Sequence, residues 1–243
     1  MARSSGTIRA LIVASSDKAY GDHGGGLPYR ESESLCGIHV YDSSKACLEH
    51  VCHTYLFQFN VPLRVTRCSN LYGPGDLNFS RLIPGTILRI LLGLPPSIHE
   101  GHEHALREYL FIDDAVDAYL KLAEGLLARP ADESRLQPQR GRDAWGSCCY
   151  NIGGGEENVC AVSAVIQEIS TLLPTAMPPV SAPRVWAAVL DIFEQQEDSS
   201  KICNETGWRP RVGFLDTGLR RTVDWYRQMF PLIEQMAREA VES

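Results

Sequence analysis

The sequence predicts an α/β fold, and three consecutive segments support this prediction. Residues 8–14 form a short, nearly all-apolar run with branched side chains, which is typical of a strand buried on both faces of a parallel sheet. Residues 42–59 carry apolar and small side chains at helical spacing, with Asp42 placed to cap the helix. Residues 61–68 form a second strand-like run. Strand, helix and strand in this order predict a right-handed crossover between parallel strands.

The rest of the chain continues to mix helical and strand-like patterns. Asp113 is placed to cap a helix that runs to about residue 127. Residues 129–146 have no apolar period and predict a surface loop or an insertion. The glycine runs at 24–26 and 153–155 do not form G-x-G-x-x-G between a strand and a helix, so we expect turns there. The other predicted elements are a helix over 82–92, strands over 108–112 and 148–152, and helices over 162–173 and 215–230.

The composition is that of an ordinary soluble globular protein and excludes several classes of partner. The 243 residues are 44% hydrophobic and 22% charged, and the net charge of −7 creates no basic field for a phosphate backbone, so we expect no nucleic-acid partner. No segment approaches the roughly 20 apolar residues that span a bilayer, and the apolar run near the start is too short for a signal peptide. We therefore expect no membrane association and a cytoplasmic location.

The cysteines and histidines show no metal-binding spacing along the chain. No two of the eight cysteines form a C-x-x-C pair, and most lie among apolar residues, so we expect free thiols in a reducing compartment. The histidines and glutamates of residues 99–104 have the spacing of a polar turn. The sequence therefore predicts no metal site.

Tyr41 and Lys45 form a Y-x-x-x-K pair at the start of the predicted helix, downstream of a strand that ends in Ser15 and Ser16. Residues four apart on a helix share one face, so the lysine ammonium can lie close to the phenol. A nearby positive charge favours the phenolate, which is the form that can act as a general base. Such a base can take a proton from a sugar hydroxyl while hydride leaves the carbon.

Five motifs occur in an order that points to a known family. They are VASSDKAYG at 13–21, YDSSK at 41–45, RCSNLYGPGD at 67–76, REYLFIDDAVDAYL at 107–120 and YNIGGG at 150–155. Together they resemble the NAD-dependent epimerase/dehydratase family, the extended short-chain dehydrogenase/reductases. Within that family, the pattern is most similar to CDP-glucose and dTDP-glucose 4,6-dehydratases.

The resemblance implies a role for each matching residue. Ser16 corresponds to the family residue that hydrogen-bonds the reacting hydroxyl, and Tyr41 corresponds to the base. Lys45 corresponds to the lysine that holds both the tyrosine and the nicotinamide ribose, so Tyr41 and Lys45 are also the implied contacts for the NAD cofactor. Asn70 matches a substrate-binding asparagine, and Arg107 is a candidate for the nucleotide phosphates, which the guanidinium fork suits.

Asp17 and Lys18 follow Ser16 directly, and the resemblance implies that they catalyse the loss of water. In dTDP-type dehydratases the corresponding pair is Asp-Glu, acting as acid and base, whereas 4-epimerases usually carry small or apolar residues there. An Asp-Lys pair resembles the CDP-glucose type.

The resemblance implies the C-terminal part of a Rossmann-like parallel sheet plus a smaller substrate-binding region. We expect residues 1–75 to form part of the dinucleotide-binding domain and residues 76–243 to form the substrate-binding region, with segments that return to the sheet. The implied function is that of an NAD-dependent nucleotide-sugar 4,6-dehydratase, which oxidises carbon 4 and removes water across carbons 5 and 6. A nucleotide-sugar 4-epimerase is the alternative, and a truncated, non-catalytic nucleotide-sugar-binding remnant is an alternative of another class.

The chain departs from the family at its start, because no G-x-x-G-x-x-G precedes residue 8. The cofactor pyrophosphate normally sits at that motif, so we expect the chain by itself to bind NAD weakly and to be catalytically silent. We also expect an open sheet edge beside residues 8–14, which favours a homo-oligomer or a partner that supplies the missing N-terminal half.

Overall fold

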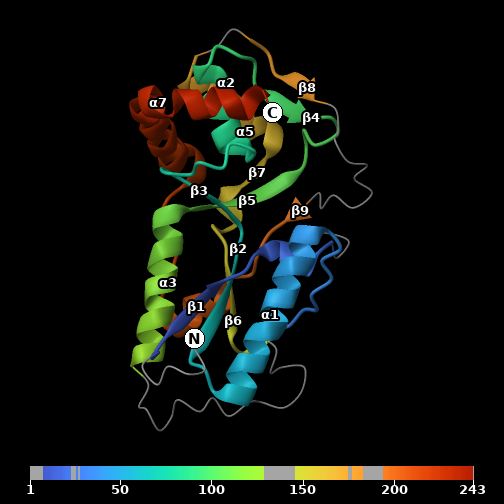
Figure 1. Ribbon diagram of the computed structural model, residues 1–243, viewed down its shortest axis with the longest axis vertical. Helices are drawn as coiled ribbons and strands as arrows, with labels where there is room; N and C mark the ends of the chain where they lie inside the picture. The colour runs from blue at the N-terminus through green and yellow to red at the C-terminus, as the bar shows by residue number, and fades with distance from the viewer. Residues whose placement is uncertain are drawn as a thin grey trace.

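The computed structural model describes residues 8–22, 26, 28–128, 146–174, 177–182 and 194–242, and it confirms the α/β fold. A three-stranded parallel sheet has the order β1-β2-β6. Its strands are β1 (Leu11–Ala14), β2 (Leu63–Cys68) and β6 (Cys149–Ile152). Helices α1 (Val40–Phe59) and α3 (Ile112–Leu127) cover its two faces (Figure 1).

Alternating side chains along the strands build a separate core on each face of this sheet. Leu63, Val65 and Cys149 pack toward α1. Tyr150 and Ile152, next along β6, pack toward α3 and the short helix α6 (Ser200–Thr206). This alternation follows from the two-residue period of a strand.

The second part of the fold is built around β5 (Leu106–Phe111), which is parallel to β3 and β9 and antiparallel to β7. Those strands are β3 (Asn70–Tyr72), β7 (Val159–Ala161) and β9 (Glu194–Gln195). A parallel pair, β4 (Ser97–His99) and β8 (Val180–Ala182), lies beyond them. The helices of this part are α2 (Leu82–Leu91), α5 (Val162–Leu172) and α7 (Leu219–Glu242), with α7 preceded by a π-helical turn over Phe214–Gly218.

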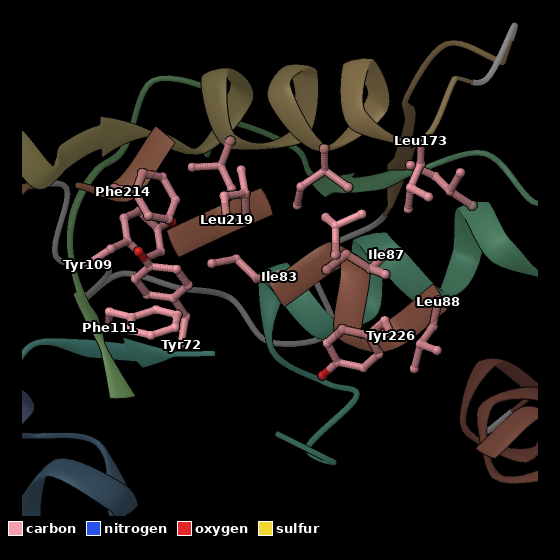
Figure 2. Packing of buried hydrophobic residues seen from close by; sticks show 14 of the residues in the cluster. Tyr72, Ile83, Ile87, Leu88, Tyr109, Phe111, Leu173, Phe214, Leu219 and Tyr226 are labelled. Carbon is pink, nitrogen blue, oxygen red and sulfur yellow. The ribbon is translucent and has the colours of Figure 1, made fainter. Parts of the chain in front are cut away.

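A third core fills the space between these helices and strands. Tyr109 and Phe214 stack with ring centroids 4.3 Å apart, and the ring of Tyr72 meets Phe214 edge-on. Figure 2 shows these aromatic side chains beside the aliphatic residues of α2, among them Ile83 and Ile87. This core packs α2 and β5 together. Both elements also form the wall of a pocket that lies opposite the carboxyl ends of β1 and β2, so the core holds that wall in place.

The predicted strands and helices within the described residues are present, but both predicted helix caps are wrong. His39 is the N-cap of α1 and Phe111 that of α3. Asp42 and Asp113 instead lie in the first turn, where a negative charge interacts favourably with the helix dipole. The predicted strand over 108–112 also ends one residue early, because Ile112 already begins α3.

Residues 8–14 were expected to form a strand buried on both faces, and this is only partly correct. The strand begins at Leu11, and Leu11, Ile12 and Val13 are half-buried. Among the described strands, β1 pairs with β2 alone and forms the edge of the sheet, which explains its exposure. The predicted loop over 129–146 lies outside the described residues except for Gly146.

The eight cysteines are free thiols, as expected. Every helix in the described parts of the chain is too short or too polar to cross a lipid bilayer.

A buried ion pair joins α1 to the sheet. Arg67 on β2 and Glu49 on α1 are fully buried, and Arg67 Nη2 lies 2.6 Å from Glu49 Oε2. Arg67 Nε donates to both carboxylate oxygens, and the Ser15 hydroxyl donates to Oε1 at 2.6 Å. The geometry satisfies both charges, and removal of either partner would leave the other buried without its counter-charge.

We expect Arg67→Met to lower the free energy of unfolding by about 3–5 kcal/mol, because it strands the Glu49 carboxylate. The double variant Glu49→Leu with Arg67→Met should recover most of that loss, since it removes both charges. Arg81→Met is the matched control, because Arg81 pairs with Asp76 at 3.1 Å with its side chain about half exposed, and its effect should stay below about 1 kcal/mol. Urea unfolding measures all three, and equal losses for Arg67→Met and Arg81→Met would contradict the assignment.

Candidate active site

A pocket of about 730 Å³ lies beyond the carboxyl ends of β1 and β2, where parallel α/β sheets bind ligands. Its other walls come from α2, β5 and the segment around β4. Six of the seven residues predicted from the sequence line this pocket: Ser16, Asp17, Lys18, Tyr41, Asn70 and Arg107. Lys45 is the seventh and is not among the lining residues, although it lies close behind Tyr41.

Ser16 and Asp17 lie where the chain leaves β1 and enters a 3₁₀ turn, Asp17–Tyr20. The Ser16 hydroxyl accepts from the Lys18 N–H at 3.3 Å and donates to Asp17 Oδ1 at 2.9 Å. Asp17 is only 3% exposed, and its Oδ2 has no hydrogen-bond partner among the described residues. The turn therefore holds a serine hydroxyl and a partly unsatisfied carboxyl group at the pocket wall.

Tyr41 and Lys45 lie in the first two turns of α1, four residues apart. Lys45 Nζ is 5.5 Å from the centre of the Tyr41 ring and donates to the Ala14 carbonyl at 3.3 Å. The lysine thus joins the start of α1 to the end of β1 and brings a positive charge near the phenol. Tyr41 is 53% exposed, so a ligand in the pocket can reach its side chain.

Lys18 and Asn70 are tied to neighbouring strands. Lys18 Nζ donates to the Oε1 of Gln195, a buried side chain on β9. Asn70 at the start of β3 donates from Nδ2 to the Glu108 carbonyl on β5 at 3.0 Å. These bonds orient both side chains at the pocket before any ligand binds.

Arg107 on β5 is half-buried, and its Nη1 donates to the Leu106 carbonyl at 2.9 Å. Two further arginines line the pocket and were not singled out from the sequence, Arg81 and Arg89 of the α2 region. Arg89 donates from Nε to the Pro95 carbonyl at 2.8 Å. The spacing of residues 81, 85 and 89 places them on one helix face, and this signal could have identified both arginines.

Buried carboxyl groups lie behind Asp17. Glu108 Oε1 accepts from the Gly155 N–H and Oε2 accepts from the Glu197 N–H, both at 2.8 Å. Burial raises the pKa of Glu108 to about 7, and the negative charge of Asp17 contributes. Burial likewise raises the pKa of Glu197 well above its ordinary value, again with Asp17 contributing. Protons are therefore retained near Asp17 at a pH where exposed carboxyl groups have lost theirs.

This carboxyl cluster should make the free energy of unfolding depend on pH. The folded-state pKa values of Glu108 and Glu197 lie above the ordinary value of 4.5, so the folded state holds extra protons above that pH. We expect the contribution of these two groups to the free energy of unfolding to be greatest below about pH 4.5. It should fall as the pH rises through about 7, the pKa of Glu108.

Glu197→Gln should flatten this fall, because the amide oxygen can still accept from the Ile152 N–H while carrying no ionisable proton. Glu239→Gln, at an exposed position of α7, is the control and should leave the slope unchanged. Urea unfolding from pH 5 to pH 8 measures the slopes, and an unchanged slope in Glu197→Gln would refute the contribution of Glu197.

A pocket at the carboxyl edge of a parallel sheet, with a Tyr–Lys pair and a serine beside it, defines a class of protein. The model of the NAD dependent epimerase/dehydratase family matches residues 1–132, and the chain belongs to that family. The resemblance found in the sequence is thereby confirmed.

The chain is similar to particular members of the family. It is 31% identical over 223 residues to dTDP-glucose 4,6-dehydratase of Neisseria meningitidis, an alignment that covers 87% of this chain and 56% of that protein. The crystal structure of dTDP-glucose 4,6-dehydratase from Bacillus anthracis in complex with NAD matches with a TM-score of 0.73 and 27% identity, over 91% of this chain and 63% of that one. The UDP-glucose 4-epimerase of Thermus thermophilus in complex with NAD matches with a TM-score of 0.72 and 25% identity, over 90% and 64%.

The chain thus spans less than two thirds of the length of these relatives. The matches include both dehydratases and an epimerase, so they establish the family and leave the particular reaction open.

Proposed function

We propose that this chain provides the catalytic and substrate-binding residues of an NAD-dependent nucleotide-sugar 4,6-dehydratase. The observation that carries the proposal is the presence of Tyr41 and Asp17 in the wall of one pocket. A base for a sugar hydroxyl and an acid for a departing hydroxyl are both needed for this reaction. The proposed division into a partial cofactor domain, 1–75, and a substrate-binding region, 76–243, assigns both residues to the first part.

The proposed first step is oxidation at carbon 4 of a nucleotide-linked hexose. Tyr41, as phenolate, takes the proton of the C4 hydroxyl, and Ser16 hydrogen-bonds the same oxygen. NAD, when bound, would supply the acceptor for the C4 hydride and, after water is lost, the donor of a hydride to C6, while C5 regains a proton from Lys18. The residues fit the nicotinamide end of NAD, since Lys45 keeps its ammonium 5.5 Å from the Tyr41 ring at the edge of the pocket and can bind the ribose.

The proposed second step is loss of water across carbons 5 and 6. Lys18, as the neutral amine, takes the proton from C5, and the electrons of that C–H bond form the C5–C6 double bond. The C6–O bond breaks, and the departing oxygen takes a proton from Asp17 to become water. The burial of Asp17 and its Oδ2 without a partner support its role as the acid.

Asn70 and Arg107 are proposed to bind the substrate. Arg107 lines the pocket on β5 and offers a guanidinium to the nucleotide phosphates, with Asn70 on the adjacent strand near the sugar. The CDP-, dTDP- and UDP-linked forms of glucose are the substrates to compare, because the aligned relatives act on dTDP-glucose and UDP-glucose by name.

Two rival functions make different predictions. A 4-epimerase needs Tyr41 but no acid at C6, and the similarity to the Thermus thermophilus epimerase favours this reading as the second candidate. A non-catalytic binder would retain nucleotide-sugar affinity without turnover, and titration with NAD separates it from an enzyme. The cytoplasmic location stays a prediction from the sequence.

We expect Tyr41→Phe to lower nucleotide-sugar turnover at least about 100-fold, in a protein that joins this chain to a complete NAD-binding domain, because it removes the proposed general base. Tyr55→Phe is the matched control, since Tyr55 lies on the same helix, is partly exposed and is not among the residues that line the pocket. Near-parental turnover in Tyr41→Phe with an unchanged circular dichroism spectrum would show that Tyr41 is not the base.

We expect the product from a nucleotide-glucose to be the 4-keto-6-deoxy sugar, identified by mass spectrometry and NMR. Asp17→Asn should lower the formation of this product about 100-fold or more, while transfer of hydride from C4 to NAD persists. Asp22→Asn, at an exposed position shortly after Asp17, is the control. Clean interconversion of gluco and galacto forms would exclude the dehydratase in favour of the epimerase.

A further inference from the structure

Three potential metal ligands from distant parts of the sequence meet between α1 and β6. They are His53 on α1, Cys148 just before β6 and Cys149, its first residue, and all three are buried. The Nε2 atom of His53 lies 3.6 Å from Cys148 Sγ and 4.0 Å from Cys149 Sγ, and the two sulfur atoms are 4.0 Å apart. None of the three lines the pocket described above.

The triangle formed by these atoms has the size that one bound zinc ion requires. Zinc bonds are about 2.3 Å to sulfur and about 2.0–2.1 Å to nitrogen, so tetrahedral angles place two sulfurs about 3.8 Å apart and sulfur and nitrogen about 3.6 Å apart. The observed separations of 4.0, 3.6 and 4.0 Å differ from these by a few tenths of an ångström. A disulfide would instead bring the sulfurs to about 2.05 Å.

The surroundings balance the charge that such a site would carry. Two thiolates, a neutral imidazole and a divalent cation sum to zero. The nearest buried carboxylate, Glu49, is already neutralised by Arg67. The Cys149 thiol donates to Glu49 Oε2 at 3.5 Å in the metal-free chain, and this bond is given up with the thiol proton when the ion binds. A divalent ion can therefore enter the core without leaving an uncompensated charge.

The backbone that presents the two cysteines is held in place from the other side. Lys201 on α6 donates from Nζ to the carbonyls of Gly146, Ser147 and Cys149, at 2.5, 3.2 and 2.7 Å. These bonds fix the turn into β6, so both thiol side chains start from a constrained backbone. A site assembled in this way loses little freedom when an ion binds.

We propose that His53, Cys148 and Cys149 bind one thiophilic divalent cation, Zn²⁺ by preference, which joins α1 to β6. Thiolate and imidazole ligands select zinc over Mg²⁺ or Ca²⁺, which prefer oxygen. Binding replaces the two thiol protons, which leave to solvent, and no oxidation state changes. The site is independent of the proposed dehydratase reaction, because it requires neither NAD nor nucleotide-sugar.

The test uses the reduced, chelator-treated chain, titrated with Zn²⁺ against a chromogenic chelator and separately with Co²⁺. We expect one Zn²⁺ per chain, a thiolate-to-cobalt charge-transfer band, and a higher midpoint of thermal unfolding with Zn²⁺. Cys148→Ala, Cys149→Ala and His53→Ala should each weaken Zn²⁺ binding at least about tenfold. Cys36→Ala and Cys47→Ala, at exposed positions, are the matched controls and should retain the parental affinity.

A measurement on the parental chain guards against variants that fail to fold. Because Cys148 and Cys149 are buried, alkylation is measured at a urea concentration at which their thiols react in the metal-free chain. Zn²⁺ should then protect two thiols, and mass spectrometry of the digested protein should assign them to Cys148 and Cys149. The proposal would be overturned if Zn²⁺ binding were absent or far below one ion per chain, or if Cys36→Ala or Cys47→Ala weakened it. It would also be overturned if Cys148 and Cys149 were alkylated equally fast with and without Zn²⁺. A mass loss of two hydrogens, showing that the pair forms a disulfide in place of a metal site, would overturn it as well.

Discussion

The buried ion pair between Glu49 and Arg67 fixes the register of α1 on the parallel sheet, and the candidate site depends on that register. Tyr41 and Lys45 lie two turns and one turn before Glu49 on the same helix. A slip of α1 by a single turn would move them about 5.4 Å along the sheet. Such a shift would separate Lys45 from the Ala14 carbonyl and displace Tyr41 in the pocket wall that it shares with Ser16. The ion pair thus positions Tyr41 and Lys45 through the helix, and it contacts the pocket wall directly through Ser15.

Two buried carboxyl groups near Asp17, those of Glu108 and Glu197, have raised pKa values. Burial keeps protons on Glu108 and Glu197 at a pH where exposed carboxyl groups are charged, and each group makes ionisation of the next more costly. Backbone N–H groups of Gly155 and Ile152 hold the two side chains in place.

Much of the fold could be predicted because short apolar runs and helical spacing mark its elements along the chain. The run of residues 61–68 and the helical spacing of residues 42–59 gave the correct element types within a few residues. The two predicted N-caps were wrong for a specific reason. Aspartate is favoured both at the N-cap and in the first turn of a helix, so the sequence alone does not distinguish these positions for Asp42 and Asp113. Of the six predicted site residues that line the pocket, Ser16, Asp17, Lys18 and Asn70 follow the carboxyl ends of β1 and β2, where ligands bind in such sheets. Tyr41 at the start of α1 and Arg107 near the start of β5 reach the same pocket through the fold.

What the sequence could not provide was proximity between segments far apart in the chain. The spacing of cysteines along the chain predicts no metal site, because Cys148 and Cys149 come close to His53 only through the pairing of β6 with β2. Arg81 and Arg89 were not predicted as site residues for a different reason. The helix over 82–92 was predicted, but nothing in its sequence indicates that a pocket lies against it.

A single stripe on α1 links these observations. Residues 41, 45, 49 and 53 are spaced by four, so they follow one slowly winding face of the helix. In order they carry the proposed base, the lysine beside it, the buried carboxylate and the imidazole near the two thiols. At a rise of 1.5 Å per residue, the first and last lie about 18 Å apart on one rigid helix. The Glu49–Arg67 pair lies between the two ends of this stripe, so one buried contact holds both the proposed base and the imidazole against the sheet.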